Sequence, residues 1–374
     1  MSTKMRILHF VSRTIIGVVF MFSGFVKGID PLGTAYRLED YFMAWGTDWM
    51  MPAAVTLSVL LSTMEFVLGF VVLFNLKPKV NAWMLLGVMI YFTGLTLYDA
   101  VANPVPDCGC FGDAIKLTNV QTFLKNVILF IPTVILFIWR KKAKDRYSNL
   151  QAYGTAGVIT ALFAGMCLFC IMHLPIIDFM EWKKGNKMFT ESNLPVKYYL
   201  TYRNKQTGET KEYLSPDYPF NDSVWMSQWE FVDQRVDDPN EYLGADLQIV
   251  DLEGNDVTND IIRDPGYHFM LITWDIAKAN KGALKSVNDL AMKAESDGYG
   301  FASITSSLPA EIDTVSKQLN LRYTFYQADD VALKIMVRSN PGLILMKAGV
   351  VIDKWAFRDI PDYKEIKKEM IADQ

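Results

Sequence analysis

Four cysteines are the residues of this chain best suited to chemistry. Cys108 and Cys110 flank a single glycine, while Cys167 and Cys170 are separated by two apolar residues. Thiol–disulfide exchange proceeds by attack of a thiolate on a disulfide sulfur, and a second nearby thiol can resolve the mixed disulfide. The two pairs therefore predict thiol–disulfide exchange. His173 lies one helical turn after Cys170, on the same face, where a protonated imidazole would favour the Cys170 thiolate.

Structural roles compete with this chemistry. Cys167 and Cys170 lie in an apolar run and could simply pack as small hydrophobic residues. Cys108 and Cys110 lie in a polar loop and could form a static disulfide. Four cysteines also suit a metal in number, but half of the ligands would lie in lipid, and the spacing is not that of a zinc fold. We therefore expect no metal.

The elements that must position these cysteines differ between the two parts of the chain. Residues 1–175 are strongly apolar, whereas residues 176–374 are mixed and compatible with water. A predominantly apolar run of about 18 residues or more, with few or no charges, can cross a membrane as a helix. Five such runs are present, at residues 8–26, 53–76, 81–100, 120–139 and 152–174.

Basic residues predict how these spans are oriented. They precede the first span and fill the second–third and fourth–fifth loops: Lys4, Arg6, Lys77, Lys79, Arg140, Lys141, Lys142, Lys144 and Arg146. Basic loops stay in the cytoplasm, so the N-terminus is expected inside and residues 176–374 outside. Both cysteine pairs would then face the oxidising side. We expect a multi-pass protein of a bacterial inner membrane, with a periplasmic C-terminal domain, in contact with lipid and not with nucleic acid.

Charged residues fall inside some of the spans. Arg13 lies in the first and Glu65 near the middle of the second. Because a charge in the membrane needs a partner or a cavity, we expect Arg13 and Glu65 to pair, either as a packing ion pair or as a proton relay to a buried redox site. Asp99 closes the third span and is expected at the level of the lipid headgroups.

The membrane half resembles a known family. Arg13, GVVFMFSG (17–24), Lys27 and IDPLGTAYRLEDYF (29–42) resemble the start of the DoxX-like membrane proteins, and CGCFGDAIKLT (108–118) is similar to the loop signature of their MauE branch. The resemblance covers roughly residues 8–140. It implies a four-helix core and a role in disulfide formation. MauE proteins belong to methylamine metabolism, where they are thought to help form disulfides.

The outer half begins with strand signals. Residues 198–214 alternate around the turn at 206–208 and predict a β-hairpin. From about residue 246, strands alternate with helices, which indicates an α/β layer fold. The order resembles a membrane-tethered thioredoxin-like domain, with Asn340-Pro341 where that family carries its cis-proline. The expected fold is thus an α-helical membrane bundle followed by a soluble thioredoxin-like domain: 1–145 four-helix domain, 146–178 fifth span, 179–245 β-rich connection and 246–374 thioredoxin-like domain.

This domain departs from its family at the redox motif. The family's CxxC should follow Trp274, but Asp275 and Lys278 stand where the cysteines belong, and residues 176–374 hold no cysteine. The domain therefore cannot exchange thiols itself. Asp275 and Lys278 are expected to form an ordinary pair at a helix start.

Two functions fit these features. The layout is similar to that of vitamin K epoxide reductase-type enzymes, which implies a thiol–disulfide oxidoreductase: electrons pass from a periplasmic protein thiol to Cys108/Cys110, then to Cys167/Cys170, then to a quinone. The alternative is a non-enzymatic scaffold that docks partners through its outer domain. Transport is a weaker third interpretation, since no repeat or broken-helix pattern is evident.

Overall fold

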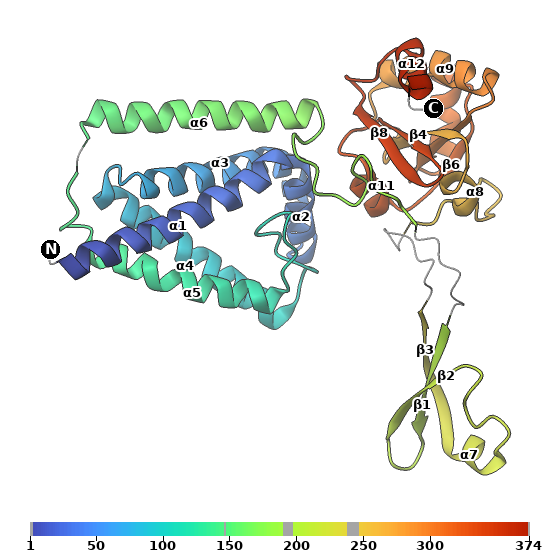
Figure 1. Cartoon of the computed structure of the whole chain (residues 1–374), viewed down its shortest axis with the longest axis horizontal. Helices are drawn as coiled ribbons and strands as arrows, with labels where there is room; N and C mark the ends of the chain where they lie inside the picture. Colours follow the sequence, from blue (N-terminus) through green and yellow to red (C-terminus); the bar gives the residue numbers. More distant parts are fainter. Residues whose placement is uncertain (1–2, 146, 190–196, 238–246, 373–374) are drawn as a thin grey trace.

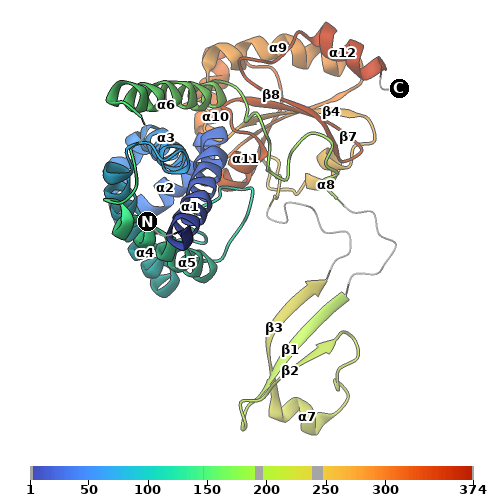
Figure 2. The ribbon, with the colours of Figure 1, turned by 60° about the vertical axis from the view of Figure 1, so that its left-hand side comes forward.

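The computed structural model describes residues 3–145, 147–189, 197–237 and 247–372. It contains a helical bundle, an α/β domain at one end of the bundle, and a slender β arm that projects from the rest (Figures 1 and 2). The N-terminus lies at the opposite end of the bundle from the α/β domain (Figure 1).

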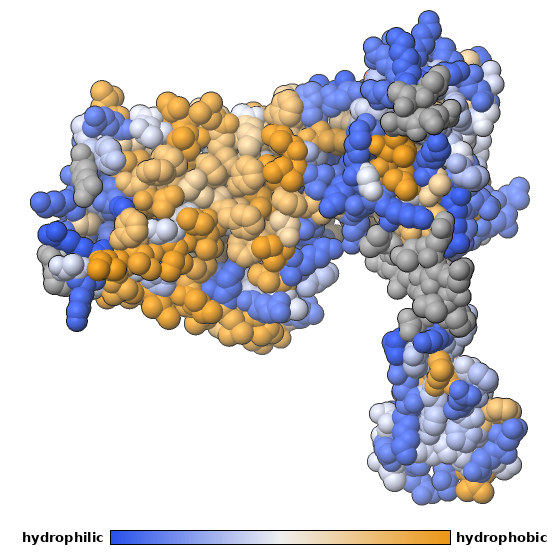
Figure 3. Space-filling view, in the orientation of Figure 1, coloured by the Kyte–Doolittle hydropathy of each residue, from blue (hydrophilic) through white to orange (hydrophobic). Residues whose placement is uncertain are grey.

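In the part of the chain that the structure describes, five long apolar helices build the bundle and confirm the five expected spans. Their side chains give the bundle an apolar flank, with hydrophilic residues gathered toward its ends, as expected of a membrane domain (Figure 3). The helices are α1 (Thr3–Ile29), α3 (Ala54–Leu73), α4 (Pro78–Ala102), α5 (Asn119–Trp139) and α6 (Asn149–Met172).

Glycines set the closest helix pair, α1 and α3. A Cβ added at Gly24 would lie 2.4 Å from the backbone nitrogen of Phe66, and one added at Gly69 would lie 2.5 Å from that of Met21. Small residues allow membrane helices to approach this closely. By contrast, α6 buries few residues and lies along the outside of the bundle (Figure 1).

A short helix crosses the end of the bundle beside the α/β domain. The sequence did not predict α2 (Pro31–Ala44). Asp30 caps it by accepting a hydrogen bond from the Gly33 nitrogen at 2.9 Å, and Pro31 occupies its first turn. A 3₁₀ helix, η1 (Asp48–Ala53), leads from α2 into α3. The 103–118 loop between α4 and α5 lies at this same end.

The arm is a three-stranded antiparallel sheet in the order β2-β1-β3. Strand β1 (Lys197–Asn204) pairs with β2 (Thr210–Leu214), which confirms the predicted hairpin. Strand β3 (Trp229–Asp237) follows the short helix α7 (Ser223–Gln228). Part of the expected 179–245 connection lies outside the described residues, at 190–196 and 238–246.

The α/β domain carries a five-stranded sheet in the order β6-β5-β4-β7-β8, with β4, β5 and β6 parallel and β7 and β8 antiparallel to their neighbours. This is the thioredoxin-like arrangement that the sequence predicted. The strands are β4 (Tyr267–Thr273), β5 (Gly300–Thr305), β6 (Phe325–Gln327), β7 (Gly342–Lys347) and β8 (Val350–Ala356).

Helices cover both faces of this sheet and complete two hydrophobic cores. On one face pack α9 (Lys281–Ser296), α10 (Pro309–Leu319) and α12 (Tyr363–Ala372). On the other pack α8 (Thr258–Ile262), α11 (Asp330–Met336) and residues near Trp182. Before the sheet, Val250 forms an isolated antiparallel bridge with Asp256.

The segment in which the resemblance led us to expect a CxxC follows β4. Lys278 forms an ion pair with Asp275 at 2.9 Å, as expected, but it does so in the turn before the helix. Helix α9 begins only at Lys281, because Asn280 provides its N-cap. The Asn340–Pro341 peptide bond is cis, at the predicted place before β7.

Candidate functional site

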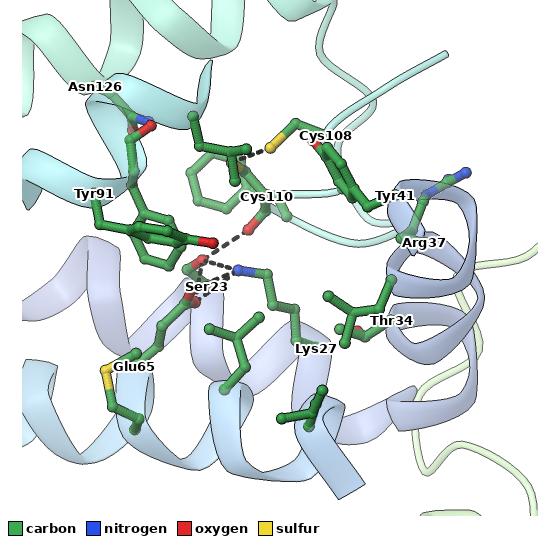
Figure 4. Close-up of a pocket in the computed structure, with 18 of the residues that line it drawn as sticks. Ser23, Lys27, Thr34, Arg37, Tyr41, Glu65, Tyr91, Cys108, Cys110 and Asn126 are labelled. Atoms are coloured by element: carbon green, nitrogen blue, oxygen red, sulfur yellow. Dashed lines mark hydrogen bonds and ion pairs between the residues drawn. The ribbon is translucent and has the colours of Figure 1, made fainter. Parts of the chain in front are cut away.

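The Cys108–Cys110 loop closes a cavity of about 560 Å³ inside the bundle. Helices α1 to α5 contribute its walls, which are mostly aliphatic and aromatic (Figure 4). The polar side chains of its lining include Ser23, Lys27, Thr34, Arg37, Tyr41, Thr47, Glu65, Tyr91, Lys125 and Asn126. An apolar cavity with a few convergent polar groups is typical of a small-molecule site.

The two loop cysteines form a contact pair. Their Sγ atoms lie 3.5 Å apart, and Gly109 between them adopts a positive φ of 64°. The hydrogen bond from Cys108 lowers the pKa of Cys110, and the charge of Lys125 adds to this, against the opposing effect of burial. The same hydrogen bond, together with burial, raises the pKa of Cys108. The pair thus has one thiol poised to be the thiolate and one poised to stay protonated.

A buried ion pair lies beside the cysteines. The Lys27 ammonium donates to both Glu65 carboxylate oxygens at 2.7 and 2.8 Å. The Ser23 hydroxyl lies 2.8 Å from Glu65 Oε2 and 2.7 Å from the Cys110 carbonyl oxygen (Figure 4). The single hydroxyl proton can be donated to either acceptor, so Ser23 links the ion pair to the cysteine loop.

The expected Arg13–Glu65 pair is wrong. Helices α1 and α3 run antiparallel, so that Gly24 meets Phe66 while Gly17 meets Leu73. Lys27 therefore reaches Glu65, whereas Arg13 lies 14 residues earlier on α1, about 21 Å away along a straight helix. Glu65 is hydrogen-bonded to Ser23 and Lys27, and its role as a proton relay stays a prediction.

A second buried carboxylate, Asp99, lies near the cysteine loop. The Tyr41 hydroxyl donates to Asp99 Oδ2 at 2.7 Å. The expected level of Asp99 near the lipid headgroups stays a prediction, whereas its side chain is fully buried within the protein. The reason is that α2 folds back over the bundle end and covers it.

The α6 cysteines lie apart from this cavity, whose lining includes no residue of α6. Cys167 and Cys170 are buried, and the Cys167 sulfur faces Gly28 on a different face of α1 from Lys27. The structure therefore does not bring the two pairs into one site, and the redox role of the α6 pair stays a prediction.

His173 does not serve Cys170 as expected. Its Nδ1 pairs with Asp359 of the thioredoxin-like domain at 2.7 Å, and its ring stacks on Phe169 at 4.5 Å. The residue is the C-cap of α6, where the chain leaves the helix and the side chain turns toward the α/β domain. His173 thus ties two parts of the molecule together.

Several residues of the site were not predicted as members of it. Ser23 and Lys27 share a helix face through i,i+4 spacing, a signal that the sequence carries. Tyr41 could have been found only by recognising α2, which the Asp30-Pro31 start indicates. No local pattern points to the pairing of these residues with the 103–118 loop.

Comparisons with known proteins found a family model, a curated relative and a solved structure that are similar to parts of this chain. Residues 5–140 match the family model of the methylamine utilisation protein MauE, a stretch that includes Cys108 and Cys110. The chain is 24% identical over 166 residues to Protein TlpB of Flavobacterium psychrophilum, an alignment that covers 43% of this chain and 45% of that protein. The chain thus spans less than half the length of that curated relative.

A solved structure is also similar in part. It is a solution structure from Bacteroides thetaiotaomicron described as a candidate protein disulfide isomerase. The similar part is 10% identical in sequence and covers 33% of this chain and 82% of the other chain, with a TM-score of 0.28. The thioredoxin-like assignment rests on the strand order of the outer sheet.

Proposed function

We propose that this MauE-type membrane protein is a thiol–disulfide oxidoreductase whose working pair is Cys108 and Cys110. The observation that carries the proposal is the placement of two sulfurs 3.5 Å apart in the wall of an apolar cavity that also holds a buried ion pair. A purely structural disulfide clip needs neither the cavity nor the charges.

The asymmetry of the pair supports a direction of exchange. In the oxidised state, a thiolate of an outer protein dithiol attacks the Cys108 sulfur, and Cys110 leaves as the thiolate because the thiol with the lower pKa leaves faster. The second substrate thiol then displaces Cys108. The substrate gains a disulfide, and two electrons and two protons remain on Cys108 and Cys110 as thiols.

The cavity has the chemistry to hold a quinone as the electron acceptor. Its walls are apolar enough for an aromatic ring and its tail, and the Lys27 ammonium offers a donor to a quinone oxygen. Ser23 and Glu65 lie in hydrogen-bond contact and would carry protons. A quinone bound there would supply a two-electron, two-proton oxidant that returns the pair to the disulfide.

The location that suits this function is a bacterial inner membrane with the N-terminus in the cytoplasm. The basic loops at 77–79 and 140–144 support it, because they lie at the bundle end opposite to the cysteine loop and the thioredoxin-like domain (Figure 1). The thiol substrate would then be a periplasmic protein, in a compartment where disulfides persist.

Differential thiol labelling tests the proposal. The purified full chain is equilibrated in glutathione buffers of graded ratio, quenched with one maleimide, reduced and labelled with a second. We expect Cys108 and Cys110 to interconvert together between dithiol and disulfide. A Cys167→Ala/Cys170→Ala variant should titrate as the parent does, because that pair lies outside the cavity.

The scaffold interpretation makes the opposite prediction. Cys108 and Cys110 would then stay in one state throughout the glutathione series, and a Cys108→Ala/Cys110→Ala variant would support partner disulfide formation as well as the parent chain does. Either result would remove the enzyme assignment.

A further inference from the structure

The thioredoxin-like domain is docked on the bundle by the edge at which its family carries redox chemistry. Trp274, where the missing CxxC would begin, lies edge-on against Tyr36 of α2, with ring centroids 6.3 Å apart. Lys334 of α11 lies over the same Tyr36 ring, 4.9 Å from its centroid. The face is therefore occupied by the chain's own α2.

Arg338 is the centre of this contact. It lies in the connection between α11 and β7, two residues before the Asn340–Pro341 peptide bond, and its side chain is only 5% exposed. Its Nε donates to Asp30 Oδ2 at 3.0 Å, and its Nη2 donates to Asp113 Oδ2 at 3.0 Å. One guanidinium thus joins the cap of α2 to the cysteine loop across 308 and 225 residues of sequence.

Asp113 belongs to a clamp on the cysteine loop. Arg37 of α2 reaches Asp107 at 3.1 Å, before the cysteines, and Asp113 at 3.4 Å, after them. Asp107 also accepts the backbone N–H of Gly109 at 2.8 Å, between the two thiols. The two carboxylates therefore lie before and after Cys108 and Cys110 in the chain, and Arg338 binds the later one, Asp113.

The surroundings fit this one arrangement closely. A buried guanidinium is tolerable only when its charge is paired, and Asp30 and Asp113 supply the two carboxylates. Gly33 leaves the space for it, since a Cβ there would lie 2.8 Å from Arg338 Nη2. The planar guanidinium of arginine can donate hydrogen bonds to two separate carboxylates at once. The compact ammonium of a lysine would bind the two carboxylates less well.

We propose that Arg338 is a positioning residue for the Cys108–Cys110 pair, through which the cysteine-free thioredoxin-like domain sets the redox equilibrium of the membrane thiols. The inference rests on the proposed function, since it concerns the same pair. The domain acts on the sulfurs by holding the loop that carries them, and it contributes no thiol.

The direction of the effect on the disulfide equilibrium follows from how little conformational freedom the held loop has. Closing the disulfide brings the sulfurs from 3.5 Å to bonding distance, about 2.05 Å. A loop already held at both ends loses little freedom in that step, so the clamp favours the disulfide over the dithiol. By linkage, oxidation of the pair must strengthen the docking of Arg338 by the same factor.

The test is the thiol–disulfide equilibrium of the full chain with glutathione, measured by differential alkylation and mass spectrometry. An Arg338→Gln variant should lower the equilibrium constant for disulfide formation about fivefold or more, the low end of typical coupling between linked sites. Asp113→Asn keeps the side-chain size, removes the charge that Arg338 and Arg37 share, and should shift the constant in the same direction.

Two variants serve as controls. Arg203→Gln removes an exposed arginine whose partner Glu230 lies on the β arm, and it should leave the constant unchanged. Arg338→Lys retains one charge in place of the fork and should fall between the parent and Arg338→Gln. Circular dichroism and the midpoint of thermal unfolding identify any variant that has lost its fold.

The outcomes separate this inference from the proposed function. A parent chain whose Cys108 and Cys110 do not exchange with glutathione would refute the proposed function. A parent chain that exchanges, with a folded Arg338→Gln or Asp113→Asn variant of unchanged or higher constant, would overturn the positioning role and leave the proposed function standing.

Discussion

At the scale of single residues, the site depends on one buried charge pair. Lys27 and Glu65 are both almost fully buried in the bundle, and each is the partner that makes the other tolerable. Loss of one partner leaves an uncompensated charge, whereas loss of both need not destabilise the fold. This asymmetry provides a test that separates stability from chemistry.

Lys27→Met should lower the free energy of unfolding by about 3–5 kcal/mol, because Glu65 is then buried without its partner. The double variant Lys27→Met/Glu65→Leu should recover most of that loss, yet should not oxidise its thiols with added quinone. Thermal unfolding in detergent and thiol labelling measure the two effects. Equal destabilisation of the single and double variants would contradict the pairing.

The loop thiols should differ in their response to pH. The thiolate is the reactive form, so the alkylation rate of Cys110 should rise with pH through its lowered pKa and level off above it. Its half-maximal rate should lie below about 8.5, the value of an ordinary thiol. Iodoacetamide labelling read by mass spectrometry measures this rate, and Cys108 in a Cys110→Ala variant serves as the comparison. A Cys110 midpoint at or above the ordinary value would refute the assigned asymmetry.

At the scale of elements, the glycine contacts between α1 and α3 determine which side chains meet. Gly24 lies against the α3 backbone, while Gly87 of α4 faces open space. Gly24→Ala should therefore destabilise the bundle by about 1–3 kcal/mol through overpacking, and Gly87→Ala should change it little. Thermal unfolding of the two variants, which make the same substitution, gives the comparison. A Gly24→Ala variant as stable as the parent would mean that the helices do not approach this closely.

The sequence predicted the helices and strands whose signals lie within a short stretch of the chain. Apolar runs revealed the five spans, and the alternating pattern of residues 198–214 revealed β1 and β2, because each signal lies within a few neighbouring residues. The Lys27–Glu65 pair was missed because it depends on the relative position of α1 and α3. The Arg338 contacts join residues hundreds of positions apart, and no local pattern records them.

At the scale of the whole molecule, the parts divide the work. The bundle contains the thiols and the cavity. The thioredoxin-like domain, which lacks cysteines, binds Asp30 and Asp113 of the bundle through Arg338. The β arm projects away from both in two views of the molecule (Figures 1 and 2). Its aromatic cluster around Tyr202 and Trp225 packs within the arm.

Replacement of residues 197–237 by a short Gly/Ser linker should leave the glutathione equilibrium of Cys108 and Cys110 unchanged within error. The physical reason is that the arm contributes no residue to the cavity or to the loop clamp. Differential alkylation of the shortened chain measures it. A shift as large as that expected for Arg338→Gln would show that the arm reaches the site.

The most direct test of the central claim is anaerobic electron transfer in the purified full chain. The protein is reduced, freed of reductant and mixed with a short-chain quinone, and quinol formation is followed by absorbance alongside thiol labelling. We predict one quinol formed per Cys108–Cys110 pair oxidised, with the same yield in Cys167→Ala/Cys170→Ala and none in Cys108→Ala/Cys110→Ala. Quinol formation that persists without the loop cysteines, or a parent chain that forms none, would contradict the account.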